Sequence, residues 1–104
     1  MASPTSRSLD KLRKEGWLAD VVEKWVPQAR VRKDLFGFID ILCLKDGVIL
    51  GVQATSGSNL SARVKKITEH ENIAEVRKAG IRIEVWGWRK NAKGRWMCRI
   101  EDVS

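Results

Sequence analysis

Two apolar runs in the middle of the chain are separated by a short polar break. Residues 36–44 and residues 48–55 are both strongly apolar, and Asp46 and Gly47 lie between them. An Asp-Gly pair between two such runs is a strong local signal for a two-residue turn that joins antiparallel strands. The pattern therefore predicts a β-hairpin.

The register of this hairpin decides which side chains share a face. With a two-residue turn, Lys45 pairs with Val48, and Asp40 lies opposite Gln53. Directly opposed side chains have Cβ atoms about 4.5–5.5 Å apart, so they can share one ligand. Period-two alternation places apolar residues on the other face, namely Ile39, Ile41, Cys43, Leu50, Val52 and Ala54. We expect a helix to cover that apolar face, and we expect Gly51 to leave space beside the polar pair.

The N-terminal quarter of the chain has weaker patterns. Residues 1–7 show no periodicity, so we expect a flexible tail, and residues 8–104 then form one domain. Ser8 is a candidate helix N-cap, and Gly16 is a candidate helix stop. The apolar positions of residues 17–26 also fit helical spacing, but their Val and Trp content and the proline that follows favour a strand.

The C-terminal half predicts a long helix and two more strands. The polar loop at residues 56–59 precedes a helical pattern that ends before Gly80. The predicted elements are a helix at 8–15, strands at 17–26, 36–44 and 48–55, a helix at 60–78, and strands at 81–88 and 95–101. This order predicts an α/β fold in which helices flank a mixed, mainly antiparallel, curved sheet.

Composition narrows the class of protein. The chain has 104 residues, of which 43% are hydrophobic and 32% charged, as in a soluble globular domain. Its apolar runs are shorter than the roughly 18 residues that a membrane helix needs. We expect a cytoplasmic protein without a membrane partner, because the N-terminal segment also lacks the apolar core of a signal peptide. Cys43 and Cys98 lie in apolar runs, so we expect them to be reduced thiols in the core. The sequence has no cluster of Cys and His residues, so we do not expect a zinc site.

The charge points to a partner. Twenty Lys and Arg residues against 13 Asp and Glu residues give a formal net charge of +7. A small domain this basic attracts polyanions, of which nucleic acids are the most common.

The polar pair in the hairpin suggests a metal site. A carboxylate such as Asp40 in an apolar strand is costly to bury unless it binds a cation or finds hydrogen-bond partners. Gln53 on the facing strand would add an amide oxygen to the same position.

These residues resemble the motif of the PD-(D/E)XK nuclease superfamily, particularly its Holliday-junction-resolvase-like and small phage-type members. Phe38-Ile39-Asp40 is similar to the Pro-Asp step, with Ile39 where proline is usual. Gln53-Ala54-Thr55 is similar to the (Asp/Glu)-x-Lys step, with Gln in place of the acid and Thr in place of the lysine. The order of elements matches over nearly the whole chain, and it implies a restriction-endonuclease-like αβββαβ core.

The resemblance implies a metal-dependent DNA endonuclease that hydrolyses phosphodiester bonds. It implies Mg²⁺ or Mn²⁺ as the cofactor, held by Asp40 and Gln53, with Thr55 hydrogen-bonded to a water of the ion. It further implies a branched or structured DNA substrate and a homodimer, since two strands must be cut. RNA remains an open alternative to DNA.

Other side chains would complete such a site. Candidates for nucleic-acid-binding cations are Lys33, Arg63, Lys65, Lys66 and Arg89, and one of the first four would take over the role of the missing lysine. Candidates for a further acid are Glu15, Glu23 and Asp34. Asp34 fits equally well as a turn residue before the strand.

Several less specific interpretations compete with these assignments. Asp40 also fits a structural acid that is hydrogen-bonded to the backbone or to an arginine. His70 is expected to be a solvated helix residue, and the tryptophans at positions 86, 88 and 96 are expected to be buried in the core. Because Gln53 and Thr55 replace the usual acid and lysine, a catalytically inactive nucleic-acid-binding domain on a nuclease fold is the main alternative function. A basic protein-interaction module is a further alternative.

Overall fold

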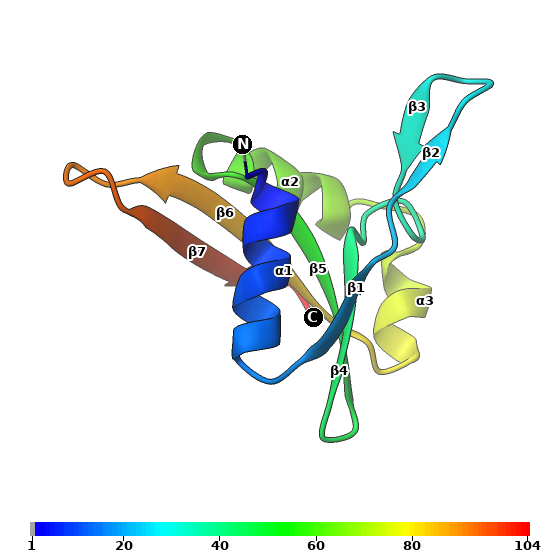
Figure 1. Cartoon of the computed structure of the whole chain (residues 1–104). Coiled ribbons are helices and arrows are strands. Elements are labelled where there is room, and N and C mark those ends of the chain that lie inside the picture. The colour runs from blue at the N-terminus through cyan, green and yellow to red at the C-terminus, as the bar shows by residue number, and fades with distance from the viewer. Residues whose placement is uncertain (1) are drawn as a thin grey trace.

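A mixed five-stranded sheet forms the frame of the protein in the computed structural model, which describes residues 2–104 (Figure 1). The strands are β1 (Leu18–Val21), β4 (Ile41–Lys45), β5 (Val48–Ser56), β6 (Arg82–Lys90) and β7 (Trp96–Asp102). They lie in the order β1-β4-β5-β6-β7, and β5 pairs with β6 in parallel while the other pairs are antiparallel. The predicted α/β class and mixed sheet are confirmed.

Helices cover both faces of this sheet (Figure 1). A parallel strand pair needs a crossover connection, and here it consists of η1 (Gly57–Asn59), α2 (Leu60–Thr68) and α3 (Ile73–Lys78). The crossover packs on one face, against Ile83 and Val85 of β6. Helix α1 (Pro4–Lys14) packs on the other face, where Leu12 meets Trp86 and Trp88. Among residues 2–104, no helix is long and apolar enough to cross a membrane.

The register of the central hairpin is confirmed. Lys45 pairs with Val48 and Ile41 pairs with Val52 around the Asp46-Gly47 turn. Most of the apolar face predicted for this hairpin is buried in the cluster under α1: Ile41, Cys43, Leu50 and Val52.

The prediction of a strand over residues 36–44 was wrong at its N-terminal end. Phe36 and Gly37 have φ angles of 56° and 94°, so the chain reverses there, and β4 begins only at Ile41. Ile39 consequently packs in the cluster under the crossover helices and not under α1. It also fills the space that was expected beside Gly51, where an added Cβ would lie 2.7 Å from Ile39 Cδ1.

The prediction of a flexible tail at residues 1–7 was also wrong for most of these residues. Helix α1 begins at Pro4, and Ser3 caps it in a reciprocal capping box with Ser6. Proline is favourable in the first turn of a helix because its missing N–H would have no intrahelical partner there. Ser8, the predicted N-cap, is instead a buried residue inside the helix. Met1 lies outside the described residues.

The segment predicted as one strand at residues 17–26 forms two. After β1 the chain leaves the sheet, and β2 (Lys24–Val26) pairs with β3 (Val31–Lys33) in a separate two-stranded hairpin. We call residues 24–33 the arm, because this hairpin projects from the body of the protein (Figure 1).

The helix predicted at residues 60–78 is interrupted at residues 69–72. His70 Nδ1 accepts a hydrogen bond from the Asn72 N–H, and the Asn72 side chain donates to the Phe36 carbonyl. Such local side-chain bonds compete with the helical hydrogen-bond pattern. His70 is therefore half-buried against Phe38 and not a solvated helix residue as expected.

The aromatic and thiol side chains follow the predictions in part. Trp86 and Trp88 are buried as expected, but Trp96 is 41% exposed, with the Arg7 guanidinium 3.8 Å from its ring centroid. Cys43 is a buried free thiol, whereas Cys98 is half-buried.

One buried hydrogen bond ties α1 to the sheet and can be tested. Trp88 Nε1 donates to Ser8 Oγ at 2.8 Å. Substituting Ser8→Ala leaves this indole N–H without its partner, so we expect a loss of about 1–3 kcal/mol in the free energy of unfolding, measured by urea denaturation. Ser61→Ala, on the exposed side of α2, is the control. Equal stability of the two variants would contradict the assignment.

Candidate metal centre

Asp40 lies where the β4–β5 ladder ends, and its side chain continues the pairing. Its Oδ2 accepts a hydrogen bond from the Ala54 N–H at 2.9 Å, and its own N–H donates to the Val52 carbonyl at 2.9 Å. The residue is only 4% exposed. The sequence therefore places a buried carboxylate at the N-terminal end of β4, held by the backbone of the facing strand β5.

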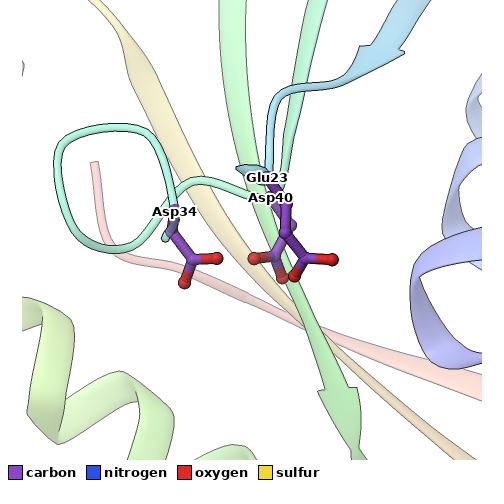
Figure 2. A group of neighbouring side chains, drawn as sticks. All are labelled: Glu23, Asp34 and Asp40. Atoms are coloured by element: carbon purple, nitrogen blue, oxygen red, sulfur yellow. The ribbon is translucent and has the colours of Figure 1, made fainter. Parts of the chain in front are cut away.

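Two more carboxylates meet Asp40 from the two ends of the arm. Glu23 directly precedes β2 and Asp34 directly follows β3. Carboxylate oxygens of Glu23, Asp34 and Asp40 all lie within 4.8 Å of one another. Figure 2 shows the carboxyl groups of Glu23 and Asp40 side by side, with Asp34 facing them. The chain reversal after Asp34 brings this third acid back to the strand.

Gln53 completes the group from β5. It is 2% exposed, and its Nε2 donates to Asp34 Oδ2 at 3.2 Å. Its Oε1 is buried and has no hydrogen-bond partner. An amide beside an acid turns its NH₂ toward the carboxylate, which leaves the carbonyl oxygen available. A buried hydrogen-bond acceptor without a partner destabilises the fold by about 1–3 kcal/mol. A hydrogen-bond donor or a cation at this oxygen would remove that cost.

These four residues line a pocket of about 270 Å³. The other lining residues are Thr5 of α1, Ala54 of β5, Arg32 of the arm, and Arg63 and Lys66 of α2. Arg32 Nη1 donates to Glu23 Oε1 at 2.8 Å. Within residues 2–104, no carboxylate lies within ion-pair distance of Arg63 or Lys66. The pocket thus combines three acids with two cations that have no acidic partner.

Burial and crowding of like charges disfavour the ionised form of Asp40. Desolvation, a hydrogen bond with the Asp34 carboxyl group and the charges of Asp34 and Glu23 raise the pKa of Asp40 to about 8. The hydrogen bond from Ala54 lowers this pKa and only partly offsets the other effects. The carboxyl group therefore needs either a proton or a cation at neutral pH.

The donor set fits a hard divalent cation. Carboxylate and amide oxygens are the ligands of Mg²⁺ and Mn²⁺, whereas zinc favours His and Cys. The lining of the pocket, as far as the structure describes the chain, contains neither His nor Cys. The unpartnered Gln53 Oε1 is the atom that a cation would satisfy. Glu23, Asp34, Asp40 and Gln53 are the residues that would hold it.

The structure brings together only part of the predicted site. Six of the predicted residues line the pocket: Glu23, Asp34, Asp40, Gln53, Arg63 and Lys66. Asp34 lies in the predicted turn, since its carbonyl accepts from the Gly37 N–H, and its carboxylate lines the pocket. Its role as a further acid of a metal site stays a prediction.

The other predicted residues lie elsewhere. Glu15 ends α1 and pairs with Lys11 at 2.9 Å. Thr55 is buried on the same face of β5 as Gln53 but does not line the pocket, and its proposed catalytic role stays a prediction. Lys33 lies on the arm, and Lys65 on the exposed side of α2. Arg89 lines a different pocket, beside Gly57.

Sequence reasoning missed two lining residues, Arg32 and Thr5. Arg32 lies two residues before Asp34. Its place in the pocket could have been suggested only if residues 24–33 had been recognised as a separate hairpin. Thr5 was assigned to the tail, and only the Ser-Pro helix start could have placed it on α1.

Comparison of this chain with protein-family models, with curated proteins and with solved structures finds no match. The assignment of the site therefore rests on its geometry and chemistry.

Metal binding should stabilise the fold through these residues. At about 100 times its Kd, a ligand of the folded state alone adds about 2.7 kcal/mol, so Mg²⁺ or Mn²⁺ should raise the Tm by several degrees. Asp40→Asn should abolish this rise, and Glu15→Gln, away from the pocket, should preserve it. A rise of the same size in Asp40→Asn would place the ion elsewhere.

The raised pKa of Asp40 predicts a pH dependence of the metal-free protein. The unfolded chain releases this proton near the ordinary pKa of 3.8, whereas the folded protein holds it to about 8. The folded state therefore binds more protons between these values, and its stability falls as the pH rises through this window. Asp40→Asn removes this dependence. Urea unfolding in a chelating buffer should show the stability of the wild type, relative to Asp40→Asn, falling with rising pH by a few kcal/mol, since one pKa unit is worth about 1.4 kcal/mol. A constant difference would contradict the burial of an acid at this position.

Proposed function

We propose that this chain is a metal-dependent DNA endonuclease that hydrolyses phosphodiester bonds. The observation that carries the proposal is the unpartnered Oε1 of Gln53 beside three carboxylates in one pocket. A basic chain with such a pocket combines attraction to a polyanion with a place for the ion that phosphodiester hydrolysis uses.

The arrangement of elements supports a restriction-endonuclease-like core. Helix α1, strands β1, β4 and β5, the crossover helices and β6 follow the αβββαβ order of the PD-(D/E)XK nucleases. Asp40 directly precedes β4 and Gln53 lies on β5, which are the positions of the acidic steps in that motif. The arm is an insertion between β1 and β4.

The pocket residues have distinct roles in this proposal. Glu23, Asp34 and Asp40 supply charged oxygens for Mg²⁺ or Mn²⁺, and Gln53 supplies a neutral one. When bound, the ion neutralises charge on the scissile phosphate and lowers the pKa of an attacking water. Ala54 fixes the orientation of the Asp40 carboxylate through its N–H. Arg32 holds Glu23 in place from the arm.

Two cations of α2 are suited to the phosphate. Arg63 and Lys66 line the pocket, and they would contact the phosphate oxygens and stabilise developing negative charge. They would take over the role of the lysine that Thr55 replaces. Their position explains how the pocket can accept an anionic substrate despite its three acids.

A catalytically inactive nucleic-acid-binding domain is the second candidate. Thr55 cannot act as a cation, and the neutral Gln53 weakens the affinity for a metal ion. In this case the basic surfaces of the chain would bind nucleic acid without cutting it. A homodimer that cuts both strands of a branched DNA stays a prediction of the resemblance.

Cleavage assays separate the two candidates. Linear, branched and single-stranded DNA are incubated with the protein in Mg²⁺ and in Mn²⁺. We expect products that require the metal, and a loss of at least about 100-fold in rate with Asp40→Asn, because this variant removes a charged ligand of the ion. Glu15→Gln should cleave like the wild type. DNA binding without products in either metal would contradict hydrolysis and favour the inactive domain.

A further inference from the structure

The arm is basic and exposed along its whole length. Residues 24–33 include four cations, Lys24, Arg30, Arg32 and Lys33, and no acid. Of the ten residues only Val26 is half-buried, and the others are exposed. A two-stranded hairpin is only marginally stable in water by itself. A projecting hairpin of this composition (Figure 1) is therefore expected to gain order from a partner.

The arm exposes a tryptophan next to its cations. Trp25 is 54% exposed and pairs with Arg32 across the hairpin. It is the most exposed of the five tryptophans, since Trp86 and Trp88 are buried and the ring of Trp96 is covered by Arg7. An exposed indole beside guanidinium and ammonium groups is the combination with which proteins stack on nucleic-acid bases and hold the backbone.

The strand pairing in the arm places two lysines opposite each other, which favours the binding of an anion. Lys24 lies directly opposite Lys33. Like charges at opposed positions destabilise a strand pair, and an anionic ligand between or beside them would remove this repulsion. The partner that fits is therefore a polyanion with exposed aromatic faces.

The arm starts and ends at the candidate metal centre. Glu23 directly precedes β2, Asp34 directly follows β3, and Arg32 binds Glu23 at 2.8 Å. Two of the three clustered carboxylates thus form the base of the arm. A strand bound along the arm would pass beside the pocket.

We propose that the arm binds unpaired nucleotides of a DNA substrate, with Trp25 stacked on a base and Lys24, Arg30 and Lys33 on the backbone. This inference rests on the proposed nuclease function and specifies its substrate, which is DNA with a junction between paired and unpaired nucleotides. The faces of bases inside a duplex are covered by their neighbours, so a projecting indole stacks most readily where the bases are unpaired.

Binding measurements without a metal test the arm separately from cleavage. The full-length protein is titrated, in a chelating buffer, into fluorescently labelled DNA of three kinds: a blunt duplex, the same duplex with two unpaired strands at one end (the forked duplex), and the single strand. Fluorescence anisotropy gives the Kd for Trp25→Ala, for Trp25→Phe and for Trp96→Ala, which removes an exposed tryptophan outside the arm. Thermal unfolding checks that each variant is folded, which we expect because Trp25 is exposed.

The expected result is specific to DNA with unpaired bases. Trp25→Ala should weaken binding to the forked duplex and to the single strand by about 5- to 100-fold, and should change binding to the blunt duplex less than about 2-fold. Trp25→Phe should restore most of the affinity, and Trp96→Ala should leave it unchanged. An equal effect of Trp25→Ala on all three DNAs, or no effect on any, would overturn the proposal.

The two proposals can fail independently. If binding to the forked duplex requires Trp25 but the wild type cleaves no DNA in Mg²⁺ or Mn²⁺, the role of the arm is supported and hydrolysis fails. If cleavage requires Asp40 but Trp25→Ala binds and cuts forked and blunt duplexes like the wild type, hydrolysis is supported and the role of the arm fails.

Discussion

Three carboxyl groups share one pocket at the N-terminal end of strand β4. Arg32 pairs with Glu23, and the repulsion between the carboxyl groups of Asp34 and Asp40 remains to be relieved. Asp40, Asp34 and Glu23 bring oxygens within 4.8 Å of one another, and Asp40 is almost fully buried. A proton on Asp40 would relieve this repulsion, and the pKa of Asp40, raised to about 8, means that the proton is retained at neutral pH. A divalent cation would relieve it as well. The amide of Gln53 favours the cation, because its NH₂ already donates to Asp34 while its carbonyl oxygen has no partner. A cation between the carboxylates would satisfy this oxygen together with the three acids.

The fold supplies these four residues from three local structures. The Asp46-Gly47 turn sets the register that brings residues 40 and 53 to the same end of the hairpin. The reversal at Phe36 and Gly37 returns Asp34 to that end. The arm begins at Glu23 and ends before Asp34, so its pairing holds both acids at one place. Helix α2 then covers the pocket with cations. The arm and the pocket are thus one continuous structure, which links the proposed cut to the proposed contact with unpaired bases.

The parts that the sequence predicts well depend on local signals. The Asp-Gly turn is such a signal, and it was enough to place Asp40 and Gln53 together. The strands β5, β6 and β7 follow from their apolar patterns, and Gly16 and Gly80 mark where the helical segments end, although the start of α1 and the break between α2 and α3 were not predicted. The list of candidate acids contained Glu23 and Asp34, but no spacing rule ranked them above Glu15, because their proximity depends on the arm.

The parts that the sequence did not predict depend on packing between distant segments. Ile39 fits the alternation of a strand, yet it packs under the crossover helices because the chain turns just before it. Ser8 has the chemistry of a helix cap, but the buried indole of Trp88, 80 positions away, gives it another role. The break in the helix at residues 69–72 is stabilised by a contact with Phe36 that no local pattern contains.

The most direct test of the central claim is a crystal structure of the protein soaked with Mn²⁺, with the ion located by its anomalous scattering. The account predicts one peak between the carboxylates of Glu23, Asp34 and Asp40, with Gln53 Oε1 among the ligands at about 2.0–2.2 Å. Mn²⁺ bound elsewhere on the protein but not in this pocket would contradict it. So would an ion in the pocket from which the Gln53 carbonyl oxygen is turned away.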